Sequence, residues 1–363
     1  MKYLFILLFL LLEVYSYSQV DNNIKKRIGL APKSGAFSME GYWVWGSSVI
    51  QGEDGIYHMY AARWPKHLTF HPGWMIQSDI VHCISPTPEG PYKFNDVALP
   101  IRGAQFWDGR SVFNPKICKY KDTYILFYTG STHPFADFPE QDSLQLNSKY
   151  SIVGRSNKRI GVAWSKDPDG PWNRLNEPVL NTRPNTFYSF LTSNAAPWIN
   201  KDGSVVMIFK SREYNKQYPY HSDMRIGVAI APEFKGPYQV VTNKPIFGYG
   251  DMPEIEDPTL WKDDDGYHIL AKDQRGVITG HVGHGIIAHS EDGISWHLDK
   301  ESYAYSKTIN WDDGTSSEMG QLERVAVLLN ANGKISHLFF ATMDGPGGFN
   351  NSSQAWNIVV PLK

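Results

Sequence analysis

The chain has 363 residues, of which 42% are hydrophobic, 14% aromatic and 20% charged, and its formal net charge is −2. The 35 basic and 37 acidic side chains nearly cancel, so no whole-molecule field attracts nucleic acid or an anionic membrane. The aromatic content excludes a disordered chain, and 31 Gly with 23 Pro argue against a helical bundle and favour short strands joined by turns.

The first element along the chain is an apolar run over 4–12 that follows a lysine and is too short to span a bilayer. Two small residues, Ser16 and Ser18, are then spaced as at a signal-peptidase site. We therefore predict a signal peptide over 1–18 and no membrane span. The mature protein over 19–363 is expected to be exported, to the periplasm or the medium.

A degenerate repeat organises the rest of the chain. Each copy has a short apolar strand, a turn and an aromatic-rich strand. The copies begin near Ser48, Pro115, Pro197, Pro258 and Val325. Asp-Gly or Asn-Gly pairs in four of the turns supply the positive φ that tight hairpins require. The first four copies are followed by another apolar strand and a turn that ends in Gly and an aromatic residue, so each unit has about four strands.

Four strands in roughly 60–80 residues are the content of a propeller blade. After the fifth hairpin only one further strand remains, over 356–360, so we expect an N-terminal strand from about 27–40 to complete the last blade. The prediction is an all-β fold: a single five-bladed β-propeller with four-stranded antiparallel blades and no second domain. A β-sandwich of the same length fits the spaced repeat less well.

The chain has two cysteines, Cys83 and Cys118, which are too few for a disulfide scaffold or a structural zinc site. Each lies in an apolar, strand-like segment, where a buried free thiol is the simpler interpretation. A bridge between the two is the alternative.

The first strand of each blade lines the channel of a propeller. Aligning the five units places these residues at its mouth: Ser47, Asn114, Ala196, Asp257 and Glu323. Through Asp257-Pro258, the segment 264–267 and the recurring Gly-Pro-Tyr/Trp turns, the sequence resembles the five-bladed glycoside hydrolases, above all family 43. The resemblance implies three carboxylates: a base in blade one, a pKa-tuning Asp in blade three and an acid in blade four.

This chain departs from that pattern, because Ser47 and Ala196 stand where the resemblance implies Asp. Glycoside hydrolysis normally needs one carboxyl acid and one carboxylate on either side of the bond. Asp257 and Glu323 are the axial acids that remain, and Glu40 or Asp108 on loops are alternative partners. The resemblance also implies an axial calcium ion in some relatives, but no ligand set in the sequence identifies one. We expect no required cofactor.

Basic side chains end several apolar strands near the same mouth. Burial of an unpaired charge is very costly, so these residues either pair with acids or bind an anion. Arg suits planar carboxylates and Lys acts as a point charge. The predicted substrate-binding residues are Arg63, Arg110, Lys210, Lys272, Arg324, Asn114 and Trp64. A carboxylate clamp is expected from Arg63, Lys210 and Arg324.

The candidates for proton transfer are His71, on the loop after the Arg63 strand, and Tyr220 and His221, on the loop beyond Lys210. Elimination from a uronic acid needs a base for the C5 proton, an acid for the leaving oxygen and cations that stabilise the developing charge. The cationic mouth therefore favours elimination on an anionic oligosaccharide, of lyase or dehydratase type. In that mechanism Asp257 and Glu323 orient sugar hydroxyls and hold the cations.

In overall character the chain is also similar to the oligosaccharide dehydratases of ulvan-degrading marine bacteria. Two alternatives to elimination remain open. One is an exo-acting glycoside hydrolase of the family 43 type that uses Asp257 and Glu323. The other is a propeller that binds glycans and catalyses nothing.

Overall fold

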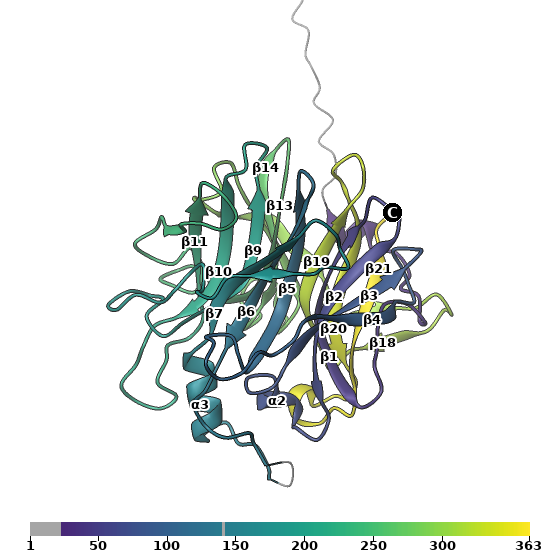
Figure 1. Cartoon of the computed structure of the whole chain (residues 1–363). Coiled ribbons are helices and arrows are strands. Elements are labelled where there is room, and N and C mark those ends of the chain that lie inside the picture. Colours follow the sequence, from purple (N-terminus) through teal and green to yellow (C-terminus); the bar gives the residue numbers. More distant parts are fainter. Residues whose placement is uncertain (1–22, 140–141) are drawn as a thin grey trace, which may run out of the picture.

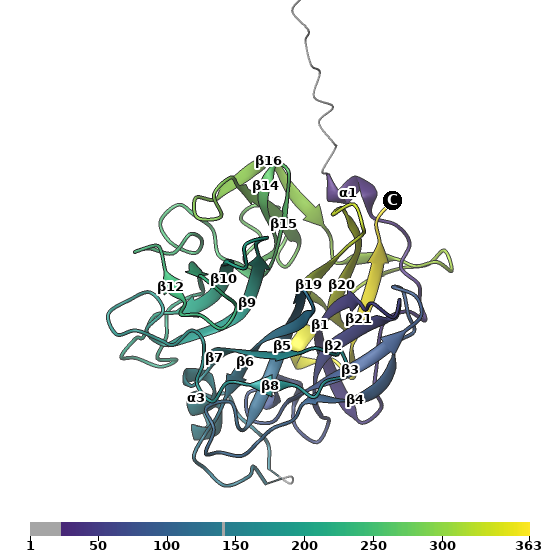
Figure 2. The same cartoon turned by 45° about the horizontal axis from the view of Figure 1, so that its top comes forward.

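The computed structural model describes residues 23–139 and 142–363, so the predicted signal peptide over 1–18 lies outside the described residues. β-Strands are the main regular secondary structure of the described chain, and the sheets are arranged around a common axis (Figures 1 and 2). The innermost strand of each sheet contacts the innermost strands of the next sheet and the previous one, which makes a closed ring. The predicted five-bladed β-propeller is confirmed.

Four blades are four-stranded antiparallel sheets. Blade one has β1 (Tyr42–Gln51), β2 (Tyr57–Pro65), β3 (Asp79–Ser85) and β4 (Lys93–Leu99). Blade two has β5 (Ser111–Tyr120), β6 (Thr123–Ser131), β7 (Arg159–Ser165) and β8 (Asn173–Arg174). Blade three has β9 (Leu191–Ile199), β10 (Val205–Arg212), β11 (Arg225–Ala231) and β12 (Gln239–Val240). Blade four has β13 (Ile255–Asp263), β14 (Gly266–Asp273), β15 (Gly285–Ser290) and β16 (His297–Tyr305).

Blade five has three strands, and the N-terminal segment completes it. The strands are β19 (Gln321–Leu329), β20 (Ile335–Met343) and β21 (Ala355–Pro361). Isolated antiparallel bridges join Phe37 to Asn357 and Ile28 to Leu362, so the segment predicted to close the ring does lie along β21. It is not a continuous strand, because Pro32 cannot donate to the ladder and nearby glycines weaken it.

A short hairpin, β17 (Thr308–Asn310) with β18 (Ser316–Glu318), connects blades four and five. The helices are α1 (Ile24–Arg27), α2 (Phe70–Gly73), α3 (Lys149–Ser156) and the 3-10 helix η1 (Gly348–Asn350). Figure 1 shows α2 and α3 at the same end of the propeller, where the second and third strands of the blades are connected. No helix in the described ranges is long and apolar enough to cross a membrane.

The core consists of apolar layers between adjacent blades, and β6 shows why its sequence is apolar without alternation. Ile125 and Phe127 face blade three and pack in a cluster with its residues. Leu126 and Tyr128 point the other way and pack in a cluster with residues of blade one. Because both faces of the strand are covered, each large side chain contributes roughly 1.5–3 kcal/mol of burial free energy.

Both cysteines are free thiols, as the simpler interpretation predicted. Cys83 is fully buried among apolar residues of blade one, and Cys118 is partly buried on β5. Burial raises the pKa of the Cys118 thiol to about 12, so it is protonated and unreactive at neutral pH.

Candidate functional site

Each innermost strand contains a β-bulge at the same level of its blade. The residue at the bulge has a φ between 52° and 57° in all five strands. These residues are Gly46, Asn114, Asn194, Asp257 and Arg324. Residues other than glycine rarely adopt a positive φ, so its recurrence in all five strands shows that the bulge is a regular feature of the blade. The bulge brings these five positions to the axis.

The bulges correct the alignment of the blades made from the sequence. Asn114 and Asp257 are axial residues, as predicted. The other axial residues differ from the predicted ones: Gly46 replaces Ser47, Asn194 replaces Ala196 and Arg324 replaces Glu323. A bulge adds a residue without changing the hydrophobic pattern, so that pattern alone leaves the register uncertain by one or two positions.

The axial side chains form a polar ring. Asn114 Nδ2 donates to Asn194 Oδ1 at 2.9 Å, and Asn194 Nδ2 donates to Asp257 Oδ1 at 3.1 Å. Arg324 Nη1 lies 2.5 Å from the same oxygen of Asp257. Gly46 fits here because a Cβ would lie 3.3 Å from Arg324 Cγ. Asp257 is therefore the buried counter-ion of Arg324 and does not line the adjoining cavity.

A cavity of about 220 Å³ lies against this ring, and residues of all five blades line it. Its apolar wall is aromatic, from Trp45, Trp64, Phe70, Trp74, Phe113 and Phe349. Its polar residues are His71, Asn114, Arg155, Lys158, Asn194, Lys210, Arg212, Glu256, Gln274, Glu323 and Arg324. Several of these belong to the connections that carry α2 and α3, so the cavity belongs to that end of the propeller (Figure 1).

Two carboxyl groups, Glu256 on β13 and Glu323 on β19, face each other across Lys272. Each stands directly before the bulge residue of its strand. Lys272 Nζ lies 2.8 Å from Glu256 Oε2 and 2.5 Å from Glu323 Oε1, and Lys210 pairs with the other oxygen of Glu256. The predicted substrate-binding residues Lys210 and Lys272 therefore hold these carboxylates.

The two carboxyl groups differ in pKa. Burial raises the pKa of Glu256, but Lys210 and Lys272 outweigh it and hold that pKa well below its usual range. Burial dominates at Glu323, which pairs with Lys272 alone among the described residues, and raises its pKa. Carboxyls with divergent pKa values in one site are typical of an acid and base pair.

The three acids Glu256, Asp257 and Glu323 do not fit a metal ion. One oxygen each of Glu256, Asp257 and Glu323 lie within 4.8 Å of one another, a spacing that a cation can bridge. Calcium needs six to eight oxygen ligands. Here Lys272 and Arg324 already neutralise these oxygens, so a divalent ion would add positive charge to a cationic site.

Three cations of the cavity have no acidic partner: Arg155 in α3, Lys158 just after it, and Arg212 at the end of β10. In the part of the chain that the structure describes, no carboxylate lies within 4.0 Å of any of them. Lys158 is 4% exposed, and its ammonium lies 4.0 Å from the centre of the Trp74 ring. Burial and the neighbouring cations hold the pKa of Lys158 well below its ordinary value.

His71 lines the cavity as predicted, but its geometry makes it a weak base. Trp74 Nε1 donates to His71 Nδ1 at 3.1 Å, so the neutral ring carries its proton on Nε2. Burial, helped by Arg155 and Lys158, lowers the pKa of His71 to about 3. At neutral pH the side chain is a hydrogen-bond donor.

Arg63 and Arg110 lie away from the cavity, which corrects the predicted clamp. Side chains alternate along β2, so Ala62 and Trp64 line the cavity while Arg63 points away and pairs with Asp79 at 2.9 Å. Arg110 pairs with Asp137 and donates to a backbone carbonyl of the same loop.

The predicted loop residues His221 and Tyr220 are also outside the cavity lining. His221 Nδ1 lies 3.1 Å from Arg212 Nη1, so it contacts the cavity through that arginine. Burial lowers the pKa of His221 to about 4. Tyr220 packs against Tyr218 in the same loop. Trp64 and Asn114 do line the cavity, although Trp64 is only 1% exposed and forms a wall.

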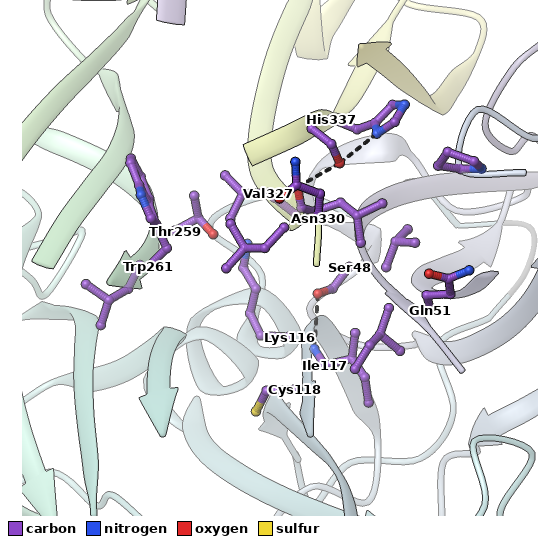
Figure 3. Close-up of a pocket in the computed structure, with 18 of the residues that line it drawn as sticks. Ser48, Gln51, Lys116, Ile117, Cys118, Thr259, Trp261, Val327, Asn330 and His337 are labelled. Atoms are coloured by element: carbon purple, nitrogen blue, oxygen red, sulfur yellow. Dashed lines mark hydrogen bonds between the residues drawn. The ribbon is translucent and has the colours of Figure 1, made fainter. Parts of the chain in front are cut away.

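A second pocket, of about 510 Å³, lies at the opposite end of the axis (Figure 3). Its lining is mainly aliphatic and aromatic and includes Trp261 and His337, and none of its described residues is a carboxylate. Its single Lys, Lys116, donates to the Val325 carbonyl at 2.9 Å, and burial lowers the pKa of this lysine to about 7. The larger pocket therefore lacks an acid and base pair.

Neither a family model nor a curated relative matches the chain. Solved structures with similar folds include Zg3597, a family 117 glycoside hydrolase of the marine bacterium Zobellia galactanivorans. That match has a TM-score of 0.65 and 16% identity, and it covers 93% of this chain and 89% of the other. A thermostable family-43 glycoside hydrolase matches with a TM-score of 0.59 and 14% identity over 92% of each chain.

CoXyl43, a family-43 β-xylosidase/α-arabinofuranosidase from a compost microbial metagenome, is also similar. It matches with a TM-score of 0.59 and 14% identity over 92% of this chain and 94% of its own. At these identities the similarity shows the fold. It confirms the resemblance to the five-bladed glycoside hydrolase propellers in architecture.

Proposed function

We propose that the protein is a carbohydrate-active enzyme and that it hydrolyses a glycosidic bond in the cavity at the α2 and α3 end. One observation carries this proposal: two carboxyl groups with divergent pKa values, Glu256 and Glu323, line a single cavity. The names of several structurally similar proteins, which are glycoside hydrolases, support it. We assign Glu256, and not Asp257, as the partner of Glu323, because Asp257 is hydrogen-bonded and ion-paired in the axial ring.

In this mechanism Glu323 is the general acid. Its raised pKa keeps the proton that passes to the leaving oxygen. Glu256 remains ionised and acts on the anomeric carbon or on a water molecule. Carboxyl groups are about 5–5.5 Å apart in retaining enzymes and about 6.5–9.5 Å apart in inverting ones. One oxygen of each carboxyl group lies within 4.8 Å of the other, and the stereochemistry of the released sugar distinguishes the two roles of Glu256.

The test compares the rate at which the wild type and the variants Glu323→Gln and Glu256→Gln release sugar from a glycoside. Loss of an acid or base costs about 10²–10⁴-fold in rate, so we expect both variants to lose at least about 100-fold in kcat. Glu318→Gln is the control, because Glu318 is an exposed acid outside the cavity. Wild-type rates in both cavity variants would contradict the proposal.

Elimination from a uronic acid is the second candidate, and the cations without acidic partners favour it. Such cations neutralise the uronate carboxylate and stabilise the developing enolate. The product distinguishes the reactions, because elimination creates a C4–C5 unsaturated uronate with its own ultraviolet absorbance. That absorbance without chain shortening indicates a dehydratase, and with shortening a lyase. Sugar release with no new absorbance indicates hydrolysis, and binding without either product indicates a glycan-binding module.

We also propose that the protein is exported, on the strength of the apolar run and the small residues before Gln19. The predicted mature N-terminus is Gln19. Mass spectrometry of the protein recovered from the periplasm or medium checks it. Retention of residues 1–18 would contradict the prediction.

A further inference from the structure

We propose that the sugar residue bound in the cavity carries a carboxylate and that Arg155, Lys158 and Arg212 bind it. This inference rests on the proposed function, because it assigns the substrate class of the same cavity. It differs from the clamp expected from the sequence, which comprised Arg63, Lys210 and Arg324. Those three residues all have acidic partners.

The charges of the cavity do not balance. Five cationic side chains line it, Arg155, Lys158, Lys210, Arg212 and Arg324, and the two acids of its lining are Glu256 and Glu323. Glu256 pairs with Lys210, Glu323 pairs with the more deeply placed Lys272, and Arg324 pairs with Asp257. Arg155, Lys158 and Arg212 therefore have no carboxylate partner among the described residues, although they line a partly desolvated space in which an anion is strongly favoured.

Lys158 points most directly to a ligand. It is 4% exposed, and its ammonium contacts the faces of Trp74 and Phe113 and no acid among the described residues. A structural lysine this deeply buried is normally paired. Its burial next to Arg155 is costly in the free protein, so the arrangement is explained by a bound negative charge. The guanidinium of Arg212 is held in place by a hydrogen bond that Nη1 donates to the Ser222 carbonyl at 2.6 Å.

The part of the β6–β7 connection that carries Arg155 and Lys158 is anchored to its surroundings. It consists of α3 and the two residues that follow it. Asn157 Nδ2 donates to the Thr132 carbonyl at 3.0 Å, and a Cβ at Gly154 would lie 2.8 Å from the Met75 carbonyl oxygen. Cations on a fixed segment are preorganised, so ligand binding loses little conformational entropy.

The arrangement fits one acidic sugar. Two guanidinium groups suit a planar carboxylate, and the lysine adds a point charge. The cavity of about 220 Å³ is smaller than the roughly 300–1,000 Å³ of pockets for drug-sized ligands, so we assign it a single terminal uronate residue. The aromatic wall beside it provides an apolar surface for the sugar ring.

The test measures binding of monosaccharides by calorimetry, since these contain no glycosidic bond to hydrolyse. D-glucuronate and D-glucose form a matched pair that differs only at C6, and glucose 6-sulfate gives an anion of a different shape. We expect the wild type to bind glucuronate at least about tenfold more tightly than the other two, and higher salt to weaken that binding. Equal binding of glucuronate and glucose, or binding of neither, overturns the inference. Tighter binding of glucose 6-sulfate than of glucuronate overturns the assignment of a carboxylate as the bound anion.

Lys158→Met and Arg155→Gln are expected to remove this preference, with at least a tenfold loss for glucuronate. Lys149→Met is the matched control, because Lys149 is an exposed lysine on the same helix, α3, outside the cavity lining. Unchanged binding in both cavity variants overturns the assignment of these residues. A wild type that binds glucuronate but hydrolyses no glycoside refutes the proposed function alone. An enzyme that hydrolyses neutral glycosides and does not bind glucuronate refutes this inference alone.

Discussion

The two ends of the axial channel differ in the property that matters for chemistry. The pocket of Figure 3 is larger, about 510 Å³ against about 220 Å³, but the described residues that line it include one lysine and no carboxylate. The smaller cavity has paired acids, uncompensated cations and an aromatic wall. Both lie on the same five inner strands, so the fold does not determine the difference. The side chains next to the bulges and the long connections at one end determine it.

The largest expected effect concerns the two lysines that represent these ends. Lys272→Met leaves Glu256 and Glu323 buried without the cation between them, and loss of one partner of a buried ion pair costs about 3–5 kcal/mol. Lys116→Met at the other end removes a lysine that donates to the Val325 carbonyl and has no ion pair among the described residues, so the expected change is small. Urea unfolding of both variants checks this difference. Equal destabilisation would show that the ends are electrostatically alike.

The second prediction concerns the stability of the fold at acid pH. Burial lowers the pKa of His71 to about 3 and of His133 and His221 to about 4, against an ordinary value of about 6.5. Between these values the unfolded chain binds more protons than the folded one, so stability decreases as pH falls below about 6.5. Each group contributes at most about 1.4 kcal/mol per pH unit.

Melting temperature against pH is the measurement, and His71→Gln should flatten the acid limb. His337→Gln is the control, because His337 belongs to the opposite pocket. An acid limb of the same steepness in His71→Gln and the wild type would contradict the prediction.

A smaller effect tests the axial ring between the two ends. Gly46→Ala places a Cβ at positive φ and 3.3 Å from Arg324 Cγ, and we expect about 1–2 kcal/mol of destabilisation. Gly55→Ala is the matched control, since Gly55 has positive φ in an open hairpin turn with nothing near its Cβ. Denaturant unfolding should show the larger loss at Gly46, and an equal loss at both would mean that backbone strain alone is responsible.

The smallest effect has the opposite sign. Lys158→Met removes a buried charge that repels its neighbours, so we expect stability to rise by about 1 kcal/mol while uronate binding falls. Calorimetric melting with and without glucuronate measures both. A variant less stable than the wild type would indicate that the ammonium contributes structurally through its contact with Trp74.

The architecture was predictable from the sequence because its determinants are local. Hydrophobic strand pairs recur five times, four of them with an Asp-Gly or Asn-Gly turn, and the single strand left after the fifth hairpin required the N-terminal segment to close the ring. The site was less predictable. A bulge at Arg324 moves Glu323 off the axis without altering the hydrophobic pattern, so the register of the inner strands was misassigned.

The cationic residues show two further reasons why the site could not be predicted fully from the sequence. Arg63 was placed in the clamp because it ends an apolar strand, although alternation with its neighbours Ala62 and Trp64 already indicated that it faces away. Arg155 and Lys158 lie in the connection over 132–158, which is outside the repeat, so no alignment of blades reaches them. The unusual length of blade two was the one signal for that segment.

We propose that the smaller cavity hydrolyses a glycoside of an acidic sugar and that Glu323 is the acid. The most direct measurement follows products from an oligosaccharide that ends in a uronic acid, with the wild type and Glu323→Gln in parallel. We expect the wild type to release the saturated uronic acid and the variant to release it at least about 100-fold more slowly. An unsaturated product, or equal release by the two proteins, would contradict it.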